Sequence, residues 1–527
     1  RTLREAIEWS YKLLDEREGL LLQRVSVFAG VFTLQAAESV GADAELDETD
    51  VLDTLGALVD KSLVVMKETD GTARYYLLET IRQYANAKLG ESGDYRRVCA
   101  RHARSYMDLA AEAGPQLITR QRPIWVQRIQ RELDNIRIAL ACTRTEAIGD
   151  HLELLGNLGW FWYSSGHWSE ARRWYDAATA LPWTDDMRRS RAAVLLGAAV
   201  VASLQGQPQV AVPWLDESAA LFQSVGDRSG EAYALAYHGV SYGQQRDART
   251  VEPTARAMAW FRAQQDLYGL RLCLVVFSTY YGSIGEMDHA REAGREAVDV
   301  PRAYGLDREL AIALQVFAAV NTNLGDFAGA EPLVRESMAA LRRDPSAFWT
   351  ARGLQQLGIV HFHIGDAERG AFLMGTAEAA RESIGSNFFG PDRLIIERAI
   401  AVGRAKIGDT MFDSAWKTGR TAPIEQVTDE EARAGARHTP GAPAPGIAAT
   451  TPLEVRALGR LEVLRDGTPL GADAWRYSKP RELLLYLLSH PEGRTRDQIG
   501  VVFWPDASAT QVKNNFHVVL NQVRNAI

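Results

Sequence analysis

The first 95 residues change from a helical hydrophobic period to a β-type one. Apolar positions three or four residues apart predict a series of helices, the last with its apolar face within 51–59. Two short β-rich runs follow, 62–66 and 75–78, on either side of Asp70-Gly71, a dipeptide typical of a hairpin turn. Helices followed by a hairpin predict a winged helix over residues 1–95.

Capping residues indicate where two of these helices begin. Thr2-Leu-Arg-Glu5 has the spacing of a capping box, in which side chains satisfy the free amides of a helix start. Thr33 is expected to cap a short third helix.

From residue 96 to 427 the pattern is helical and repetitive. Five glycines expected in turns are spaced by 40, 79, 40 and 40 residues: Gly166, Gly206, Gly285, Gly325 and Gly365. A small residue follows each of them after five positions: Ala171, Ala211, Ala290, Ala330 and Gly370. Glycine permits a tight turn between paired helices, and the small residue lets the two helices approach closely. This period predicts an α-solenoid similar to tetratricopeptide (TPR) repeats, with one further unit whose turn lies near 243–247.

Two groups of side chains in the solenoid have alternative interpretations. Aromatic residues concentrate at Trp160-Phe-Trp-Tyr163, Trp168 and Trp174, which favours core packing at repeat positions over a ligand-binding platform. His361 and His363 are two residues apart, and such residues do not share a helix face. We therefore expect no metal site there.

The composition of residues 428–451 predicts a flexible linker. It follows a helix at 411–419 that ends the helical region. The segment contains an acidic run and a stretch rich in Pro, Gly and Ala, with almost no large apolar side chain. It therefore has little surface to bury in a core.

The last segment, 452–527, combines strands with capped helices. Alternating apolar residues predict strands on either side of Asp466-Gly467. Ser478 and Thr495-Arg-Asp-Gln498 are expected to cap two helices, and Ser508-Ala-Thr-Gln511 opens a third that continues to the last residue.

This third helix has one apolar and one polar face. At about 100° per residue, the apolar side carries Val512, Phe516, Val519, Val523 and Ile527. The candidate DNA-binding residues lie on or near the other side: Lys513, Asn514, His517, Val518, Asn521, Arg524 and Asn525. Asn can bond adenine, Arg can bond guanine or phosphate, and Val can touch a thymine methyl group. Periodicity alone leaves a DNA-reading face and an ordinary solvated face equally open.

Short sequences near the N-terminus resemble a known family. They are Ala6-Ile-Glu-Trp-Ser-Tyr11, Val25-Ser-Val-Phe-Ala-Gly30, Leu58-Val-Asp-Lys-Ser-Leu63 and Leu77-Leu-Glu-Thr-Ile-Arg-Gln-Tyr84. They are similar to the winged helix that follows the nucleotide-binding domain in bacterial signal-transduction ATPases of the STAND class. The resemblance implies a domain that packs on the ATPase and regulates it, rather than a DNA reader. The sequence has no Gly-x-x-x-x-Gly-Lys-Ser/Thr phosphate loop, so any NTPase domain is expected upstream of Arg1.

The terminal segment resembles a second family. The matching sequences are Leu453–Val463, Lys479-Pro-Arg-Glu-Leu-Leu484, Phe503-Trp-Pro-Asp506 and Asn514-Asn-Phe-His517. They are similar to the OmpR/PhoB-type winged helix, in the form that opens antibiotic-regulatory-protein-type (SARP) transcriptional activators. The resemblance implies that the helix from Ser508 is the recognition helix. It also implies that a turn formed by Trp504, Pro505, Asp506 and Ala507 faces RNA polymerase. The family continues into a wing and an activation domain, which are expected beyond Ile527.

Composition adds three limits. The net charge is −8, but residues 452–527 hold ten Lys or Arg against eight Asp or Glu, which gives +2 there and −10 elsewhere. A mildly basic segment permits DNA binding. Cys99, Cys142 and Cys273 are odd in number and widely separated, which is typical of a reducing cytoplasm and unlike a disulfide framework. No apolar run approaches the roughly 20 residues of a membrane helix.

The sequence thus predicts a mainly α, cytoplasmic chain with four parts. These are a winged helix (1–95), a TPR-like solenoid (96–427), a flexible linker (428–451) and an OmpR/PhoB-type winged helix lacking its wing (452–527). Our first hypothesis is a fragment of a transcriptional regulator that binds double-stranded DNA, controlled by a protein or small-molecule effector on the solenoid. The alternative is a protein-interaction scaffold of a signalling ATPase, whose terminal winged helix binds protein. We expect no catalytic residues, metal or cofactor in this fragment.

Overall fold

The computed structural model divides the chain into two compact units, Arg1–Thr439 and Pro440–Ile527. It describes residues 3–69, 72–384 and 390–436 of the first unit. In the second unit it describes 453–456, 462–465, 468–469, 478–488, 490, 494–505 and 519.

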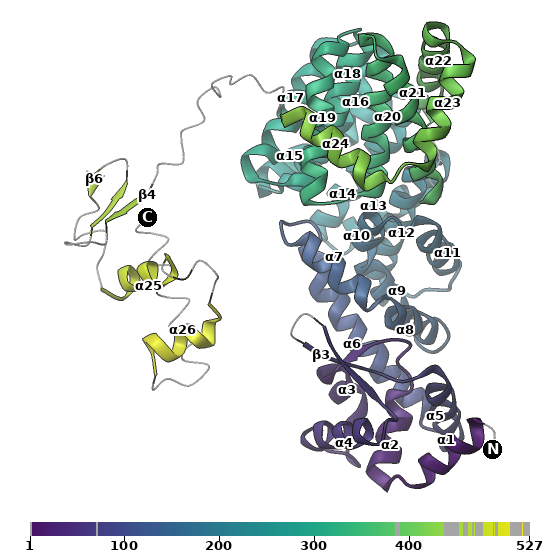
Figure 1. Ribbon diagram of the computed structural model, residues 1–527. Coiled ribbons are helices and arrows are strands. Elements are labelled where there is room, and N and C mark those ends of the chain that lie inside the picture. Colours follow the sequence, from purple (N-terminus) through teal and green to yellow (C-terminus); the bar gives the residue numbers. More distant parts are fainter. Residues whose placement is uncertain are drawn as a thin grey trace. The chain divides into compact units, whose positions relative to one another are not determined.

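The N-terminal part of the first unit has the topology of a winged helix (Figure 1). Its elements are α1 (Leu3–Lys12), α2 (Glu16–Val25), β1 (Phe32–Thr33), α3 (Leu34–Gly41), α4 (Glu48–Asp60), β2 (Val65–Thr69), β3 (Thr72–Tyr76) and α5 (Glu79–Ser92). Strand β3 is the centre of an antiparallel sheet, between β1 and β2. The predicted hairpin is confirmed, with Val65 opposite Tyr76 and Thr69 opposite Thr72. Strand β1 has two residues, too few for a periodic pattern to reveal.

Side-chain caps fix the starts of α2 and α3. The Asp15 carboxylate accepts from the Glu18 amide at 2.8 Å, and the Glu18 carboxylate accepts from the Asp15 amide at 2.9 Å. This capping box satisfies two amides that the helix leaves free. Thr33 caps α3, as predicted. The predicted capping residue Thr2 lies outside the described residues.

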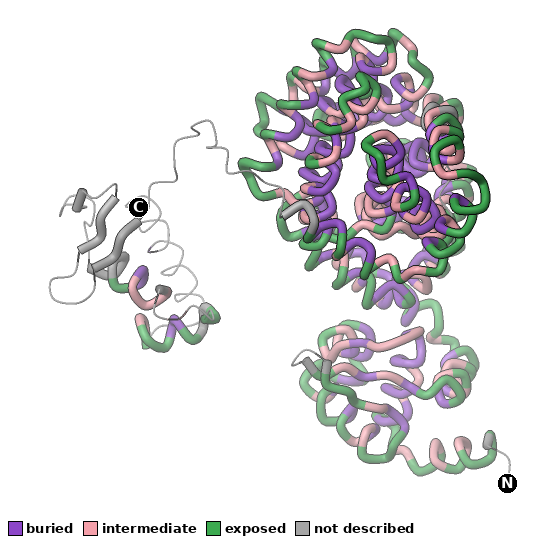
Figure 2. Tube along the Cα trace, turned by 45° about the horizontal axis from the view of Figure 1, so that its top comes forward, coloured by how far each residue is buried: buried purple, intermediate pink, exposed green. Residues whose placement is uncertain are grey.

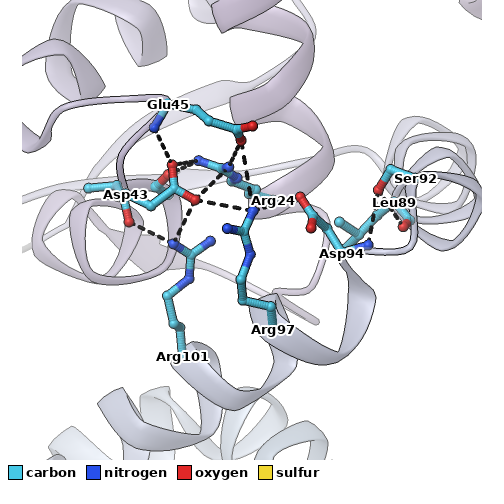
Figure 3. Close-up of polar contacts among 10 residues, drawn as sticks. Arg24, Asp43, Glu45, Leu89, Ser92, Asp94, Arg97 and Arg101 are labelled. Atoms are coloured by element: carbon cyan, nitrogen blue, oxygen red, sulfur yellow. Dashed lines mark hydrogen bonds and ion pairs between the residues drawn. The ribbon is translucent and has the colours of Figure 1, made fainter.

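Asp43, which the buried Arg24 holds in place, joins the winged helix to the long helix α6 (Tyr95–Gln116). Arg24 of α2 donates to the Gly41 carbonyl at 2.7 Å and to Asp43 at 2.9 Å. Asp43 also pairs with Arg97 and Arg101 of α6, at 3.2 and 3.3 Å (Figure 3). Burial raises the pKa of Asp43, but hydrogen bonds from a backbone amide and from Arg24 outweigh it, so this pKa lies below its ordinary value. The carboxylate therefore stays charged and holds α6 against the domain.

The rest of the first unit is a stack of helices joined by short turns (Figure 1). They are α7 (Arg122–Arg131), α8 (Leu133–Glu146), α9 (Ile148–Asn157), α10 (Gly159–Ser165), α11 (Trp168–Thr179), α12 (Arg188–Leu204), α13 (Pro208–Ser224), α14 (Arg228–Gln244), α15 (Val251–Gln264), α16 (Leu267–Ile284), α17 (Met287–Tyr304), α18 (Asp307–Asn323), α19 (Phe327–Arg343), α20 (Ala347–Ile364) and α21 (Ala367–Ser383). Buried positions lie where helices face one another, and exposed positions gather at the turns (Figure 2). Helix α16 is long and apolar enough to cross a membrane, but 67% of it is buried inside this stack.

The predicted turn glycines are confirmed. All five have a φ between 73° and 118°, in the left-handed region that favours glycine. The small residues five positions further on are all buried. In the unit without a turn glycine, Arg246 has a φ of 56° and takes the left-handed position within the predicted range 243–247. It lies 40 residues after Gly206 and 39 before Gly285, so the repeat keeps its length.

Helical packing continues past the boundary expected from the sequence. The last helices of the unit are α22 (Gly390–Ile407), α23 (Asp409–Thr421) and α24 (Ile424–Ala436). Residues 428–436, predicted as linker, are therefore helical. Val427 and Ala432 of α24 are buried in a cluster with α19. The remaining predicted linker, 437–451, lies outside the described residues.

The ion pairs of the acidic run in α24 explain why residues 428–436 are helical rather than linker. Asp429 pairs with Arg342 of α19 at 2.7 Å, and Glu431 pairs with Arg369 of α21 at 2.6 Å. These arginines lie far away in the sequence. The acidic run therefore has the same local pattern as a solvated linker, and the sequence alone does not distinguish the two.

The second unit contains a small sheet and two helices. They are β4 (Leu453–Arg456), β5 (Glu462–Arg465), β6 (Thr468–Pro469), α25 (Ser478–Leu488) and α26 (Arg496–Phe503). The sheet is antiparallel in the order β4-β5-β6, which confirms strands on either side of Asp466-Gly467. Thr495 and Gln498 form the predicted capping box of α26. Ser478 is the first helical residue of α25 rather than the residue before it.

Replacing Arg246 with glycine is expected to stabilise the solenoid. A side chain in the left-handed region costs about 1–2 kcal/mol, and the greater freedom of glycine in the unfolded chain offsets part of this. The free energy of unfolding measured in urea should therefore rise by about 0.5–1 kcal/mol. The opposite change at an equivalent turn, Gly285→Ala, should lower it by about 1 kcal/mol. A loss of stability in Arg246→Gly would show that Arg246 does not replace the turn glycine of this unit.

His102 of α6 should make the fold sensitive to acid. Its ring packs between Phe28 and Tyr106, and burial lowers the pKa of His102 to about 3. Below a pH of about 6.5, His102 is protonated in the unfolded chain but stays neutral in the folded chain. The free energy of unfolding therefore falls as the pH drops from about 6.5 toward 3. Between pH 7 and 5 the native chain should lose about 2 kcal/mol more than His102→Phe. His289 is exposed, so His289→Phe is the control. If urea titrations at both pH values showed the same loss of stability in all three proteins, this role of His102 would be ruled out.

Candidate effector groove and DNA interface

A groove of about 750 Å³ lies between the end of α6 and helices α10, α12 and α14. Trp160 and Tyr233 supply aromatic surface to it. Its charged lining residues are three carboxylates and one arginine: Glu153, Asp186, Asp227 and Arg189. Concave sites that combine aromatic surface with a few polar groups are the usual form of ligand sites in proteins.

The aromatic side chains of the groove pack against neighbouring rings. The Trp160 ring lies edge-on to Tyr233 and Tyr268, with centroids 5.1 and 5.6 Å away. The adjacent Phe161 and Trp162 are fully buried. Core packing is therefore confirmed for Phe161 and Trp162, whereas Trp160 is half-buried and also lines the groove.

Polar contacts hold the other groove residues in place. The Tyr233 hydroxyl donates to Asp266 at 2.9 Å. Asp227 accepts from the Gly230 amide at 2.9 Å and pairs with Arg189 at 3.0 Å. The Arg189 side chain is otherwise exposed, so a ligand carboxylate could replace Asp227 as its partner. The groove suits a molecule with an aromatic or apolar group and a polar end.

A buried cluster of five charged residues lies next to these aromatic side chains. Arg271 of α16 pairs with Glu309 of α18 at 2.5 Å, and its guanidinium carbon is 5.3 Å from the centroid of the Tyr268 ring. Arg122 of α7 bonds both Glu309 and Asp344. Arg308 pairs with Asp344 at 3.1 Å. None of the five side chains is more than 8% exposed.

This charge cluster connects parts of the chain that are distant in sequence. Arg122 bonds residues 187 and 222 positions further along the chain. Nearby, the rings of Trp168 and Phe348 have centroids 4.9 Å apart. The stack therefore curves back on itself, and its early helices pack against later repeats (Figure 2).

Partners in the cluster hold Glu309 and Arg122 in their charged forms. Burial raises the pKa of Glu309, but the charges of Arg271 and Arg122 outweigh it and leave this pKa below its ordinary value. Burial lowers the pKa of Arg122, but Glu309 and Asp344 outweigh it and leave that pKa raised. Removing Glu309 would leave Arg271 buried without its carboxylate partner, a change that is strongly destabilising. The sequence does not reveal this cluster, because its members share no motif.

Helix α4 is acidic, which disfavours DNA binding. It is the second helix of the helix-turn-helix, the position that lies in the major groove in DNA-binding members of this class. Its charged residues are Glu48, Asp50, Asp53 and Asp60, with no Lys or Arg. Asp53, Asp60 and the apolar Leu52 are exposed. Carboxylates on this face would repel DNA phosphates.

The residues predicted to contact DNA lie in the second unit. Lys513, Asn514, His517, Val518, Asn521, Arg524 and Asn525 are outside the described residues. Of the predicted apolar face, the structure describes Val519, which is buried and packs with Leu483 and Ile499. This agrees with the predicted direction of the apolar side.

The turn predicted to face RNA polymerase is described in part. Trp504 is half-buried beside Phe503, with ring centroids 5.8 Å apart, and Pro505 is exposed. Asp506 and Ala507 lie outside the described residues.

The two histidines of α20 occupy separate environments. His361 lies 3.4 Å from Arg335, and His363 stacks on Phe327 with ring centroids 3.8 Å apart. Within the described ranges, no group of three or more His, Cys, Asp or Glu is arranged to hold a metal ion.

Removing Arg122 should destabilise the solenoid far more than removing an exposed arginine. Arg122→Ala removes both hydrogen bonds that Arg122 makes across the stack, whereas Arg271 and Arg308 still pair with Glu309 and Asp344. Because hydrogen bonds to charged groups contribute about 1.5–3 kcal/mol each, we expect the free energy of unfolding in urea to fall by about 3 kcal/mol. The matched control is Arg343→Ala, because Arg343 pairs with Asp307 at 2.6 Å but is exposed. That change should cost less than about 1 kcal/mol. Equal losses in the two variants would show that the buried cluster does not hold the stack closed.

Comparisons with known proteins agree with the N-terminal topology. Residues 14–90 match the family described as "Winged helix-turn-helix domain". The chain is 33% identical over 321 residues to "Putative HTH-type transcriptional regulator Rv0890c" of Mycobacterium tuberculosis, a match covering 58% of this chain and 35% of that protein. It is 44% identical over 103 residues to "Uncharacterized protein Rv0894" of the same organism, covering 19% and 26%.

Among solved structures, the chain is similar to a Signal Transduction ATPase with Numerous Domains (STAND) protein with a tetratricopeptide repeat sensor from Pyrococcus horikoshii. The TM-score is 0.39 at 14% identity, covering 82% of this chain and 68% of that chain. The chain spans about a third of the length of the first curated relatives that it matches. The matched family and the order of α2 to β3 identify residues 14–90 as a winged helix-turn-helix domain.

Proposed function

We propose that this chain is part of a cytoplasmic transcriptional regulator in which the helical stack senses an effector and the second unit binds double-stranded DNA. The name of the relative that shares 33% identity supports a role in transcription. We assign no catalytic role to residues 1–527.

The acidic face of α4 is the observation that carries this division of roles. A DNA-binding surface has to compensate phosphate charge with Lys and Arg, and α4 has neither. The second unit is the better candidate because residues 452–527 have a charge of +2. Its sheet β4-β5-β6 precedes the capped helix α26, the order expected for the OmpR/PhoB-type winged helix. We assign base contacts to Asn514, Asn521 and Arg524, and polymerase contact to the turn at Trp504–Ala507.

The groove beside Trp160 is the candidate effector site. Its aromatic floor contacts the charge cluster through Tyr268 and Arg271. An effector that moved Trp160 would therefore act on the contact that closes the stack. In this proposal the effector changes how the second unit is presented to DNA.

A protein-interaction scaffold is the second candidate, and one feature favours it. The winged helix-turn-helix part exposes large apolar side chains on several elements: Trp9, Leu13, Leu52, Met66 and Leu78. Exposed apolar residues that form a patch mark protein-binding surfaces. Under this second candidate function, the second unit also binds protein rather than DNA.

DNA binding by the whole chain distinguishes the two candidates. With a duplex selected from a random-sequence pool, affinity should fall steeply between about 50 and 200 mM salt. The triple change Asn514→Ala, Asn521→Ala and Arg524→Ala should weaken binding by roughly 100-fold or more, because each base contact contributes about 1–3 kcal/mol. The control Asp53→Ala with Asp60→Ala on α4 should not weaken it. If the affinity for the duplex did not depend on salt, or was unchanged by the triple substitution, the scaffold would be favoured.

A further inference from the structure

Two cysteines that are 43 positions apart lie side by side in the first unit. The Sγ atoms of Cys99 on α6 and Cys142 on α8 are 2.8 Å apart. Both are free thiols, as is Cys273. The number and spacing of the cysteines predict no disulfide framework, but spacing does not show that two helices bring this pair together.

The surroundings favour reaction at Cys99. A hydrogen bond with Cys142 lowers the pKa of Cys99, and a hydrogen bond with Tyr95 adds to this; together they outweigh burial and bring that pKa to about 7. The thiolate is the nucleophilic form of cysteine. Cys99 itself is buried, with 4% of its surface exposed, but Cys142 beside it is half-buried and Tyr95 is exposed. A small oxidant therefore has to approach Cys99 from the side of Cys142 and Tyr95. Cys273 differs, because it is fully buried and burial raises its pKa to about 12.

We propose that Cys99 and Cys142 form a redox-sensitive dithiol that hydrogen peroxide converts to an intramolecular disulfide. The Cys99 thiolate attacks one peroxide oxygen, the O–O bond breaks, and Cys99 becomes a sulfenic acid as the other oxygen leaves as water. The Cys142 sulfur then attacks Cys99 Sγ, the S–O bond breaks, and a second water leaves. Two thiols and one peroxide give one disulfide and two waters, so the sulfurs lose the two electrons that the peroxide gains. A small thiol reverses the step by disulfide exchange.

The disulfide would fasten the two helices that carry the winged helix-turn-helix domain. Arg101 of α6 donates to the Ala42 carbonyl at 2.7 Å. Asn135 of α8 accepts from the Ala29 amide at 2.9 Å and donates to the Val31 carbonyl at 3.0 Å. Oxidation would thus stiffen the junction between this domain and the helical stack. This redox step is independent of the proposed DNA reader.

Peroxide treatment of the whole folded chain tests the pair directly. Thiols remaining after treatment are alkylated, and the disulfide is located by peptide mass spectrometry without reduction. We expect loss of two of the three thiols, a Cys99–Cys142 linked peptide, a raised melting temperature, and reversal of all three by dithiothreitol. Cys273→Ala is the matched control and should form the same linkage at the same rate.

Two single changes separate the roles of the cysteines. Cys142→Ala should stop at a Cys99 sulfenic acid that dimedone traps, and its melting temperature should not rise with peroxide. This sulfenic acid should form more slowly than in the native chain, because the hydrogen bond with Cys142 that lowers the Cys99 pKa is lost. Cys99→Ala should lose thiols roughly tenfold more slowly, because the remaining thiols lack the thiolate character of Cys99. The proposal is overturned if the Cys99–Cys142 linkage forms only in denaturant, if Cys273 replaces either partner, or if Cys99→Ala is oxidised as fast as the native chain.

Discussion

The buried contact of Arg122 with Glu309 and Asp344 is the constraint on which the helical unit depends. In a solenoid each repeat touches only its neighbours, so closing this stack requires contacts between distant repeats, such as the packing of Trp168 on Phe348. Arg122 adds a bond across 187 residues. Arg271 and Arg308 pair with the same two carboxylates, so three positive and two negative buried charges meet at this contact. The closed form of the stack therefore rests on side chains from α7, α16, α18 and the turn after α19.

This contact also links the candidate effector groove to the rest of the unit. Tyr268 packs on Trp160 on one side and on Arg271 on the other. A ligand against Trp160 would thus be separated from the charge cluster by a single aromatic ring. At the other end of the unit, the arginines around Asp43 attach the winged helix-turn-helix domain to α6. Both junctions use ion pairs of arginine, which restrict geometry more than apolar contacts do because the guanidinium group bonds in fixed directions.

The sequence predicts the structure best where the physical cause is local. The cap at Thr33, the hairpin of β2 and β3, the capping box of Thr495 and the glycine turns all depend on residues within a few positions of each other. Prediction fails where distant residues decide the outcome. The acidic run 429–431 has the local pattern of a linker because its arginine partners belong to α19 and α21. The charge cluster and the Cys99–Cys142 pair have members on different helices, and no spacing rule connects them. The candidate DNA contacts of the second unit stay a prediction.

In the proposed regulator, charge assigns the two winged-helix segments different roles, and photo-crosslinking of the whole chain to duplex DNA tests this assignment most directly. Crosslinked peptides identified by mass spectrometry should map to residues 504–527. They should be absent from 48–76, where α4 presents carboxylates to any approaching phosphate. Crosslinks concentrated in 48–76, with none in 504–527, would contradict the assignment.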